Sequence, residues 1–126
     1  MIVTAGKFKG QKVVAPDKNI TRPTLSKVRM SIFNTLQAIV DFEGSSFLDM
    51  FAGSGIMGLE ALSRGFSSAV AIEKNPKVAR IIKGNFKNFT QAPKLLIGDS
   101  TKIATKLSEK FDVIYIDPPY FSGIYE

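Results

Sequence analysis

The sequence contains neither cysteine nor histidine. Without cysteine there are no disulfides and no thiolate metal sites, and without histidine the commonest metal ligand and general base is missing. No apolar run approaches the roughly 20 residues that a membrane helix needs, and the N-terminus lacks the pattern of a secretory signal. Any chemistry must therefore rely on carboxylates, carbonyls and aromatic rings, and we expect a cytoplasmic protein that binds neither a metal nor a membrane.

Acidic residues are almost missing from the first 30 positions, although the whole chain has a net charge of +6. Residues 31–126 carry ten basic and ten acidic side chains, so the excess belongs to residues 1–30, where seven positive charges minus one negative charge leave +6. A basic arm is typical of proteins that bind a polyanion, although a solvated basic face has the same composition. The charges concerned are Lys7, Lys9, Lys12, Lys18, Arg22, Lys27 and Arg29 against Asp17.

The 126 residues are enough for one hydrophobic core. The hydrophobic pattern divides them into a basic hairpin or arm over residues 1–24 and an α/β core over residues 25–126. Met1–Val14 has two short apolar runs around a glycine- and lysine-rich stretch, which predicts a β-hairpin. Helical spacing follows from about Leu25 to Val40, with Thr24 or Ser26 as the N-cap.

From Ser46 onward, short apolar runs alternate with amphipathic segments, which predicts βαβ units and a mostly parallel sheet. In the segment Lys77–Phe89, one helical stripe is apolar and is expected to pack on the sheet, whereas Lys77, Arg80, Lys83 and Lys87 are expected to face water. The apolar stripe is Val78, Ile82, Phe86 and Phe89. The expected strands are Phe47–Phe51, Ala69–Glu73, Lys94–Ile97 and Val113–Asp117, and the expected helices are Met57–Arg64, Lys77–Phe89 and Thr101–Leu107.

A glycine-rich turn, Asp49–Gly58, stands between the first of these strands and its helix. In Rossmann-like folds this turn approaches a nucleotide: Gly53 and Gly55 let the backbone pass close to a ligand, and Gly58 lets the helix pack tightly on the strand. Tight turns also need glycine for purely structural reasons, and the pattern formally satisfies the dinucleotide fingerprint as well. The turn therefore predicts a nucleotide-containing ligand without deciding which one.

Two carboxylates end the next two expected strands. Glu73 stands twenty positions after Gly53, where an acidic residue binds ribose hydroxyls. Asp99 follows the third strand and is suited either to hold an adenine edge, together with the next backbone N–H, or to cap the helix that begins near Thr101. A solvent-facing strand-end carboxylate is the simpler alternative for Glu73.

The sharpest signal is Asp117-Pro118-Pro119-Tyr120, directly after the fourth expected strand. Two prolines remove two backbone donors and stiffen the turn, which leaves a site rich in oxygen acceptors. Such a site suits an exocyclic amino group: the Asp117 carboxylate and the Pro118 carbonyl accept its two protons and direct its lone pair toward a methyl sulfonium. Tyr120 is placed to stack on the base. A rigid Pro-Pro turn capped by an aromatic ring is the structural alternative.

Taken together, these segments resemble the RsmD-type 16S rRNA (guanine-N2) methyltransferases over nearly the whole chain. The Asp-Pro-Pro-Tyr element is shared with many amino-methyltransferases, whereas the N-terminal segments are more particular to the RsmD type. The segments that carry the resemblance are Gly6–Gly10, Thr21–Thr24, Val28-Arg29 with Ile32–Asn34, Asp49–Gly58, Glu60–Gly65 and Asp117–Tyr120.

The resemblance implies a class I methyltransferase fold, S-adenosyl-L-methionine as methyl donor, and a guanine of 16S rRNA in the small ribosomal subunit as acceptor. It implies that the catalytic residues are Asp117, Pro118, Pro119 and Tyr120. The target base must leave its stack to reach them. It assigns RNA binding to Lys7, Lys9, Lys12, Arg22 and Arg29, with Arg22 alternatively shaping the cofactor pocket. The implied cofactor-binding residues are Asp49, Phe51, Ala52, Gly53, Ser54, Gly55, Glu73, Lys74, Asp99 and Ser100.

Family members of this type continue well beyond the Asp-Pro-Pro-Tyr motif, and the complete form is expected to be a monomer. The resemblance therefore predicts a sheet truncated after the fourth strand, with an unpaired edge, and weak cofactor binding by this chain alone.

Three other functions remain open from the sequence. An adenine-N6 DNA methyltransferase uses a similar acceptor-rich turn, although no target-recognition insert is visible. A dinucleotide-dependent oxidoreductase would explain the glycines but neither the Asp117–Tyr120 motif nor the basic arm. An inactive RNA-binding fragment is the non-enzymatic alternative.

Overall fold

A computed structural model describes residues 1–16 and 26–118 of the chain. In these residues four parallel strands form one sheet in the order β3-β2-β1-β4. The central pair is in register at Leu48 and Val70, and Leu48 also pairs with Ile114 on the other side. The strands are β1 (Ser46–Asp49), β2 (Ser68–Glu73), β3 (Lys94–Ile97) and β4 (Val113–Tyr115). The predicted parallel sheet is therefore confirmed.

The helices alternate with the strands as the periodicity predicts. They are α1 (Ser26–Gln37), α2 (Ile56–Arg64), α3 (Pro76–Phe86) and α4 (Ser100–Lys106), and none of them is long and apolar enough to cross a membrane. Helix α3 ends at Phe86, earlier than expected, and β1 and β4 each end two residues early. Strand β1 therefore ends at Asp49, with residues 50–55 in the turn before α2, and Asp117 and Pro118 lie beyond the end of β4.

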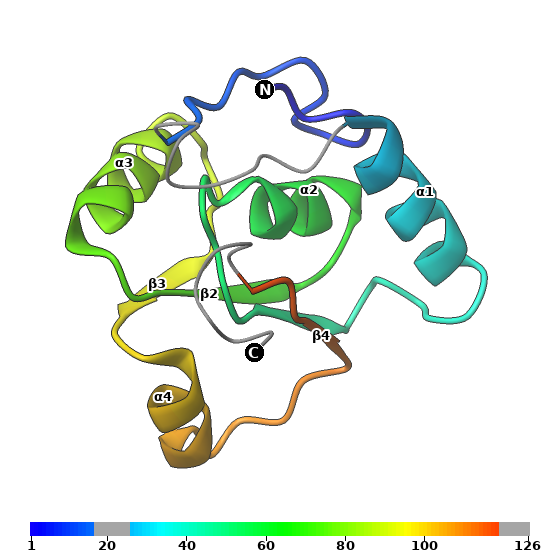
Figure 1. Ribbon diagram of the computed structural model, residues 1–126. Helices are drawn as coiled ribbons and strands as arrows, with labels where there is room; N and C mark the ends of the chain where they lie inside the picture. Colours follow the sequence, from blue (N-terminus) through cyan, green and yellow to red (C-terminus); the bar gives the residue numbers. More distant parts are fainter. Residues whose placement is uncertain (17–25, 119–126) are drawn as a thin grey trace.

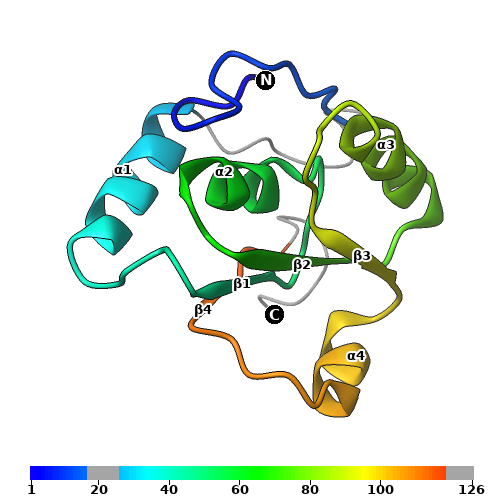
Figure 2. The same cartoon turned by 180° about the vertical axis from the view of Figure 1, so that it is seen from behind.

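Helices cover both faces of the sheet, but unequally (Figure 1). Helices α1, α2 and α3 lie on one face together with the N-terminal segment, and α4 lies alone on the other, as the reverse view also shows (Figure 2). The alternation of β2 explains this division, because Ala69 and Ala71 belong to the clusters under α2 and α3, whereas Val70 and Ile72 pack toward α4. Small alanines on the first face let α2 and α3 approach the strand closely.

The apolar stripe of α3 packs largely as predicted. Val78 and Ile82 are buried against Ala52 and Ala71. Phe89 lies beyond the end of the helix and contacts Phe8 of the N-terminal segment instead of the sheet, with the two ring centroids 5.2 Å apart at 83°. The basic residues of the opposite stripe, Lys77, Arg80, Lys83 and Lys87, are exposed as expected.

The N-terminal segment, residues 1–16, folds back on itself as an antiparallel loop. Ile2 and Lys12 form an isolated bridge, and the backbone N–H of Val3 donates to Gln11 while that of Val13 donates to Met1. The two halves of the segment therefore run antiparallel, as predicted for a hairpin, but they form one isolated bridge and no β-strands. Its stability comes from contacts with the helices beneath it.

The carboxylate of Glu60 in α2 supplies the main polar contact of this segment. Glu60 is fully buried and accepts hydrogen bonds from the backbone of Thr4 and Ala5, from the Thr4 hydroxyl, and from the Nε atoms of Arg29 and Arg64 at 2.9 and 2.8 Å. Burial by itself would raise its pKa, but the hydrogen bonds from Arg64, Thr4 and Arg29 outweigh it and lower the pKa below the ordinary value.

The assignment of Arg29 to RNA binding is wrong. Arg29 is fully buried, and its guanidinium donates to Glu60 and to the backbone carbonyl of Ile2. A buried cation needs a partner charge, and here it bridges α1, α2 and the N-terminal segment rather than facing solvent. The sequence did not predict this role, because Arg29 is one of seven basic residues among the first 30.

We expect Glu60→Gln to lower the free energy of unfolding by about 3 to 5 kcal/mol, because it leaves buried guanidinium charge without its carboxylate. Since folding lowers the pKa of Glu60 below 4.5, its contribution is present at neutral pH and is lost as the pH falls through the folded value. Urea denaturation at pH 7 measures the effect, and loss of any cooperative transition counts as the same outcome. The matched control, Glu109→Gln at an exposed carboxylate, should stay within about 0.5 kcal/mol; equal effects in both variants would contradict the prediction.

Candidate functional site

The strand order places a candidate site at the carboxyl ends of the strands. The chain runs outward from β1 through β2 to β3 and then returns to add β4 on the other side of β1. Open α/β sheets commonly bind ligands at such a change of direction, beyond the carboxyl ends of the two strands. The loops after β1, β2 and β4 meet at this edge, which is marked in Figure 1 by the ends of the central strands.

The glycine-rich turn leads from β1 into α2 at this edge. Gly53 has φ +57° and Gly55 has φ +84°, a region that side chains rarely enter. A Cβ on Gly53 would meet no atom within 4 Å, so the backbone there faces open space, as a ligand-approaching position requires. A Cβ on Gly55 would lie 2.7 Å from the Phe86 ring, so its closest approach is to α3.

Gly58 permits close packing, but against a different partner from the one expected. A Cβ at this position would lie 2.7 Å from the ring of Pro93, in the segment that precedes β3. The neighbouring residues hold the turn to the rest of the fold: the Ala52 N–H donates to Ile72, and the Ser54 carbonyl accepts from Asn85. Phe51 is half-buried, whereas Ser54 is buried.

Glu73 connects the end of β2 to the glycine turn. One carboxylate oxygen accepts the backbone N–H of Gly53 at 3.0 Å, and the other accepts that of Asn75 at 3.0 Å. Glu73 is thus directed at the turn rather than out into solvent. Each oxygen retains acceptor capacity, because a carboxylate has about four lone-pair sites. The binding of ribose hydroxyls stays a prediction.

Asp99 is the N-cap of α4, as one of its two predicted roles requires. Its carboxylate accepts the backbone N–H of Thr101 at 2.9 Å and the Thr101 hydroxyl at 2.6 Å, and these bonds lower its pKa. The charge of Lys74 acts in the same direction more weakly. Ser100, the first residue of the helix, is buried. A contact of Asp99, Lys74 or Ser100 with a cofactor stays a prediction.

Asp49 is the most perturbed group of the site. It is buried at the end of β1; one carboxylate oxygen accepts the N–H of Phe51, and the other finds no partner in the described part of the chain. Burial is the main cause that raises its pKa to about 7, and the negative charges of Glu73 and Asp117 add to it. Glu73 and Asp117 are therefore close enough to Asp49 for their charges to act on it, at the carboxyl ends of the strands.

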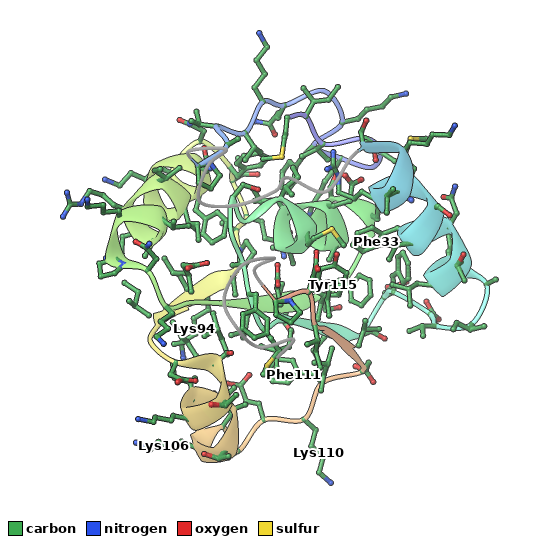
Figure 3. The ribbon with its side chains drawn as sticks, viewed as in Figure 1. Phe33, Lys94, Lys106, Lys110, Phe111 and Tyr115 are labelled. Carbon is green, nitrogen blue, oxygen red and sulfur yellow. The ribbon has the colours of Figure 1, made fainter. Side chains whose placement is uncertain are left out.

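Asp117 is exposed just beyond β4, and its carboxylate accepts the Tyr115 hydroxyl at 3.3 Å. The Tyr115 ring lies parallel to Phe47 with centroids 6.5 Å apart, and Figure 3 labels it at the end of β4. Sequence reasoning missed Tyr115, although its alternation in β4 with Val113 indicates this face. Pro118 is half-buried, and Pro119 and Tyr120 lie outside the described residues.

The basic residues predicted to bind RNA are distributed over different environments. Lys7, Lys9 and Lys12 are exposed on the N-terminal segment, where the Lys7 ammonium donates to the Gln91 side chain. Arg22 lies outside the described residues, and Arg29 is buried as described above. Asn85 is a further residue that the sequence did not reveal: it bonds both to Val14 and to the glycine turn.

A hollow of about 770 Å³ lies at the opposite end of the sheet, lined by residues 37–43 with Arg64 and Gly65. Its walls come from the end of α1, from the segment before β1 and from the end of α2. None of the loops that follow a strand contributes to it. Among residues 1–16 and 26–118 no group of acidic side chains is arranged to hold a metal ion.

Comparison with known proteins places this architecture in a family. The family model described as Conserved hypothetical protein 95 matches residues 1–126. YlbH of Bacillus subtilis (strain 168), whose name assigns it provisionally to the rRNA methyltransferases, is 38% identical over 125 residues that cover 95% of this chain and 67% of YlbH. The Ribosomal RNA small subunit methyltransferase D of Escherichia coli (strain K12) is 30% identical over 125 residues, which cover 98% of this chain and 62% of that protein.

Solved structures show the same fold. A hypothetical protein of Thermus thermophilus superposes with a TM-score of 0.84 at 31% identity, covering 95% of this chain and 70% of that one. The Escherichia coli protein yhhF, described provisionally as a methyltransferase, superposes with a TM-score of 0.83 at 29% identity, covering 98% of this chain and 67% of that one. The chain thus spans roughly two thirds of the length of the proteins that it matches.

The raised pKa of Asp49 predicts an unusual dependence of stability on pH. Because folding raises this pKa from 3.8 to about 7, the native state holds the proton more tightly than the unfolded chain, so the associated stability is complete below the unfolded value and is lost as the pH rises through 7. Between pH 5 and 8 we expect a loss of about 2 to 3 kcal/mol. Urea denaturation across this range should show the loss in the wild type and in the control Asp41→Asn, but not in Asp49→Asn.

Proposed function

The chain belongs to the Conserved hypothetical protein 95 family, the RsmD-type methyltransferases, and from this premise we propose that it is the cofactor-binding and catalytic part of an S-adenosyl-L-methionine-dependent methyltransferase. The proposed acceptor is the exocyclic N2 of a guanine in 16S rRNA of the small ribosomal subunit. The observation that carries the proposal is the buried Asp49 at the end of β1, whose pKa burial raises and the charges of Glu73 and Asp117 raise further, beside a glycine turn that Glu73 holds through the Gly53 N–H.

The residues of the candidate site suit a positively charged nucleoside cofactor. S-adenosyl-L-methionine supplies an electrophilic methyl group on a sulfonium, and it also carries an ammonium group and two ribose hydroxyls. The unpartnered oxygen of Asp49 is suited to accept from an ammonium group, which would also favour the ionised form of that carboxyl. Glu73 is suited to accept from the ribose hydroxyls. Further proposed cofactor contacts are Phe51, Ala52, Ser54, Gly55, Lys74, Asp99 and Ser100.

Asp117 and Pro118 supply the acceptors for the base. The Asp117 carboxylate is exposed, and the hydroxyl of Tyr115 contacts it from the β4 side. We assign to this carboxylate and to the Pro118 carbonyl the two N–H groups of the guanine amine, which turns the nitrogen lone pair toward the methyl donor and stabilises the positive charge that develops on nitrogen. Pro119 and Tyr120 complete the motif and are proposed to enclose the base.

Labelled methyl transfer tests the proposed function. The chain is incubated with radiolabelled S-adenosyl-L-methionine and, in parallel, with undermethylated small subunits, naked 16S rRNA and duplex DNA. We expect label in 16S rRNA, recovered as N2-methylguanosine after nuclease digestion. Label in adenine of DNA would favour the adenine-N6 enzyme instead, and RNA binding without transfer would identify a binding module.

Asp117→Ala should reduce methyl transfer by about 10²- to 10⁴-fold, the range expected when a group that handles a proton is removed. Cofactor affinity should remain nearly unchanged, because Asp117 is assigned to the acceptor rather than to the donor. Transfer kinetics and calorimetric titration of the cofactor separate the two effects, with Glu109→Ala as the control for an exposed carboxylate. Equal losses of transfer and of cofactor binding would indicate a structural role for Asp117.

A further inference from the structure

We propose that the RNA-contacting surface extends from the N-terminal segment along the exposed stripe of α3, so that the two form one cationic surface that binds the phosphate backbone. We call this the α3 surface, and it consists of Lys7, Lys9, Lys12, Lys77, Arg80, Lys83 and Lys87. This inference rests on the proposed function, because it takes RNA as the partner. It adds four basic residues around α3 to the predicted RNA-binding residues. The sequence analysis did not predict them, because residues 31–126 carry equal numbers of basic and acidic side chains.

The N-terminal segment is docked on the carboxyl-terminal end of α3. The Asn85 side chain accepts the N–H of Val14 at 2.9 Å and donates to the Val14 carbonyl at 2.9 Å. The Gln11 side chain donates to the Asn88 carbonyl, and the Phe8 and Phe89 rings meet edge to face. The opposite views in Figures 1 and 2 both show this segment running to α3. Lysines that are about 70 residues apart in sequence therefore lie on neighbouring elements.

Carboxylates are absent from the stretches of sequence that build this surface. Residues 1–16 contain three lysines and no acidic residue, and residues 74–98 contain six basic residues and no acidic one. The acidic residues of the chain are Asp17, directly after the first stretch, and those that fall between 41 and 73 or after 98. Lys74 is left out of the surface because its charge acts on Asp99. The even balance of residues 31–126 thus conceals a basic stretch around α3 that contains no acidic residue.

The spacing of the α3 cations suits a nucleic-acid backbone. Positions 77, 80, 83 and 87 are three or four residues apart and share one face of the helix. At about 1.5 Å per residue the stripe spans about 15 Å. A duplex strand exposes a phosphate every 3.4 Å or so along its axis, so roughly four phosphates fit along the stripe. It begins four residues after Glu73 and ends beside the N-terminal segment, which joins the candidate site to the basic arm.

The exposed positions of α3 favour RNA over a lipid surface. They are Pro76, Lys77, Arg80, Lys83 and Gly84, whereas the apolar Val78 and Ile82 are buried under the helix. Membrane-surface helices need apolar side chains that enter the headgroup region, and this stripe presents none. A phosphate backbone requires only the cations.

Paired charge removal tests the proposal. Lys83→Gln with Lys87→Gln removes two charges from α3, and the matched control, Lys102→Gln with Lys106→Gln, removes two exposed charges from α4. Figure 3 labels Lys106 and Lys110 at the α4 end of the molecule, on the far side of the sheet from the N-terminal segment. The ligand is undermethylated 16S rRNA, with affinity measured by filter binding from 50 to about 500 mM salt. Circular dichroism confirms that both variants fold.

The α3 variant should weaken binding roughly 25- to 60-fold at 0.1 M salt and reduce the slope of log affinity against log salt by about 1.4 to 1.8, since each phosphate contact contributes about 0.7 to 0.9. The control should keep the wild-type slope. In the methyl-transfer assay, the α3 variant should raise KM for the RNA without changing kcat.

Equal slopes in the two variants would overturn the α3 surface, while methyl transfer by the wild-type chain would still support the proposed function. The α3 variant could instead show the reduced salt slope while the wild-type chain transfers no methyl group. That result would support the α3 surface and overturn the proposed enzymatic function. Vesicles of phosphatidylglycerol and phosphatidylcholine serve as the second ligand. If Lys83 and Lys87 affect binding to these vesicles but not to RNA, the surface is a lipid contact and the proposal is wrong.

Discussion

The buried carboxylate of Glu60 is the contact on which the placement of the N-terminal segment depends. It receives hydrogen bonds from that segment and from two arginines on different helices, so α1, α2 and residues 1–16 meet at one charged group. Because each guanidinium is buried with it, removing either sign of charge leaves the other uncompensated. The fold therefore uses an internal ion network, rather than extended β-pairing, to hold its basic segment over α2.

That placement has consequences for the candidate site. Asn85 bonds to Val14 of the N-terminal segment and to the Ser54 carbonyl of the glycine turn, so the segment that carries Lys7, Lys9 and Lys12 is two hydrogen bonds away from the proposed cofactor loop. The turn itself is held from the other side by Glu73. A network of side-chain to backbone bonds thus fixes the relative positions of the two surfaces that the proposed reaction needs.

The candidate site and the α3 surface carry charges of opposite sign. Asp49 lies where the parallel strands end, and burial raises its pKa to about 7, with smaller contributions from the negative charges of Glu73 and Asp117. Concentrated negative charge in a crevice is unfavourable until a cation enters, and sites of this kind commonly carry function. The exposed cations of α3 and of the N-terminal segment belong to elements that cover one face of the sheet (Figure 1). This division suits a positively charged methyl donor inside and a polyanionic acceptor outside.

Local patterns in the sequence were enough to predict the order of the elements, the parallel sheet and the glycine turn. They also placed Glu73, Asp99 and Asp117 at or near the ends of strands. These features depend on the repeats of helices and strands and on the chemistry of turns, which act over a few residues. Helix and strand ends were predicted less well, since they depend on where the backbone leaves the sheet. The roles of Arg29, Asn85 and Tyr115, the contact of Gly58 with Pro93, and the joining of α3 to the basic segment were decided only by tertiary structure. Each of them depends on a partner that is distant in sequence or on the packing of neighbouring strands, and no local pattern encodes which partner that is.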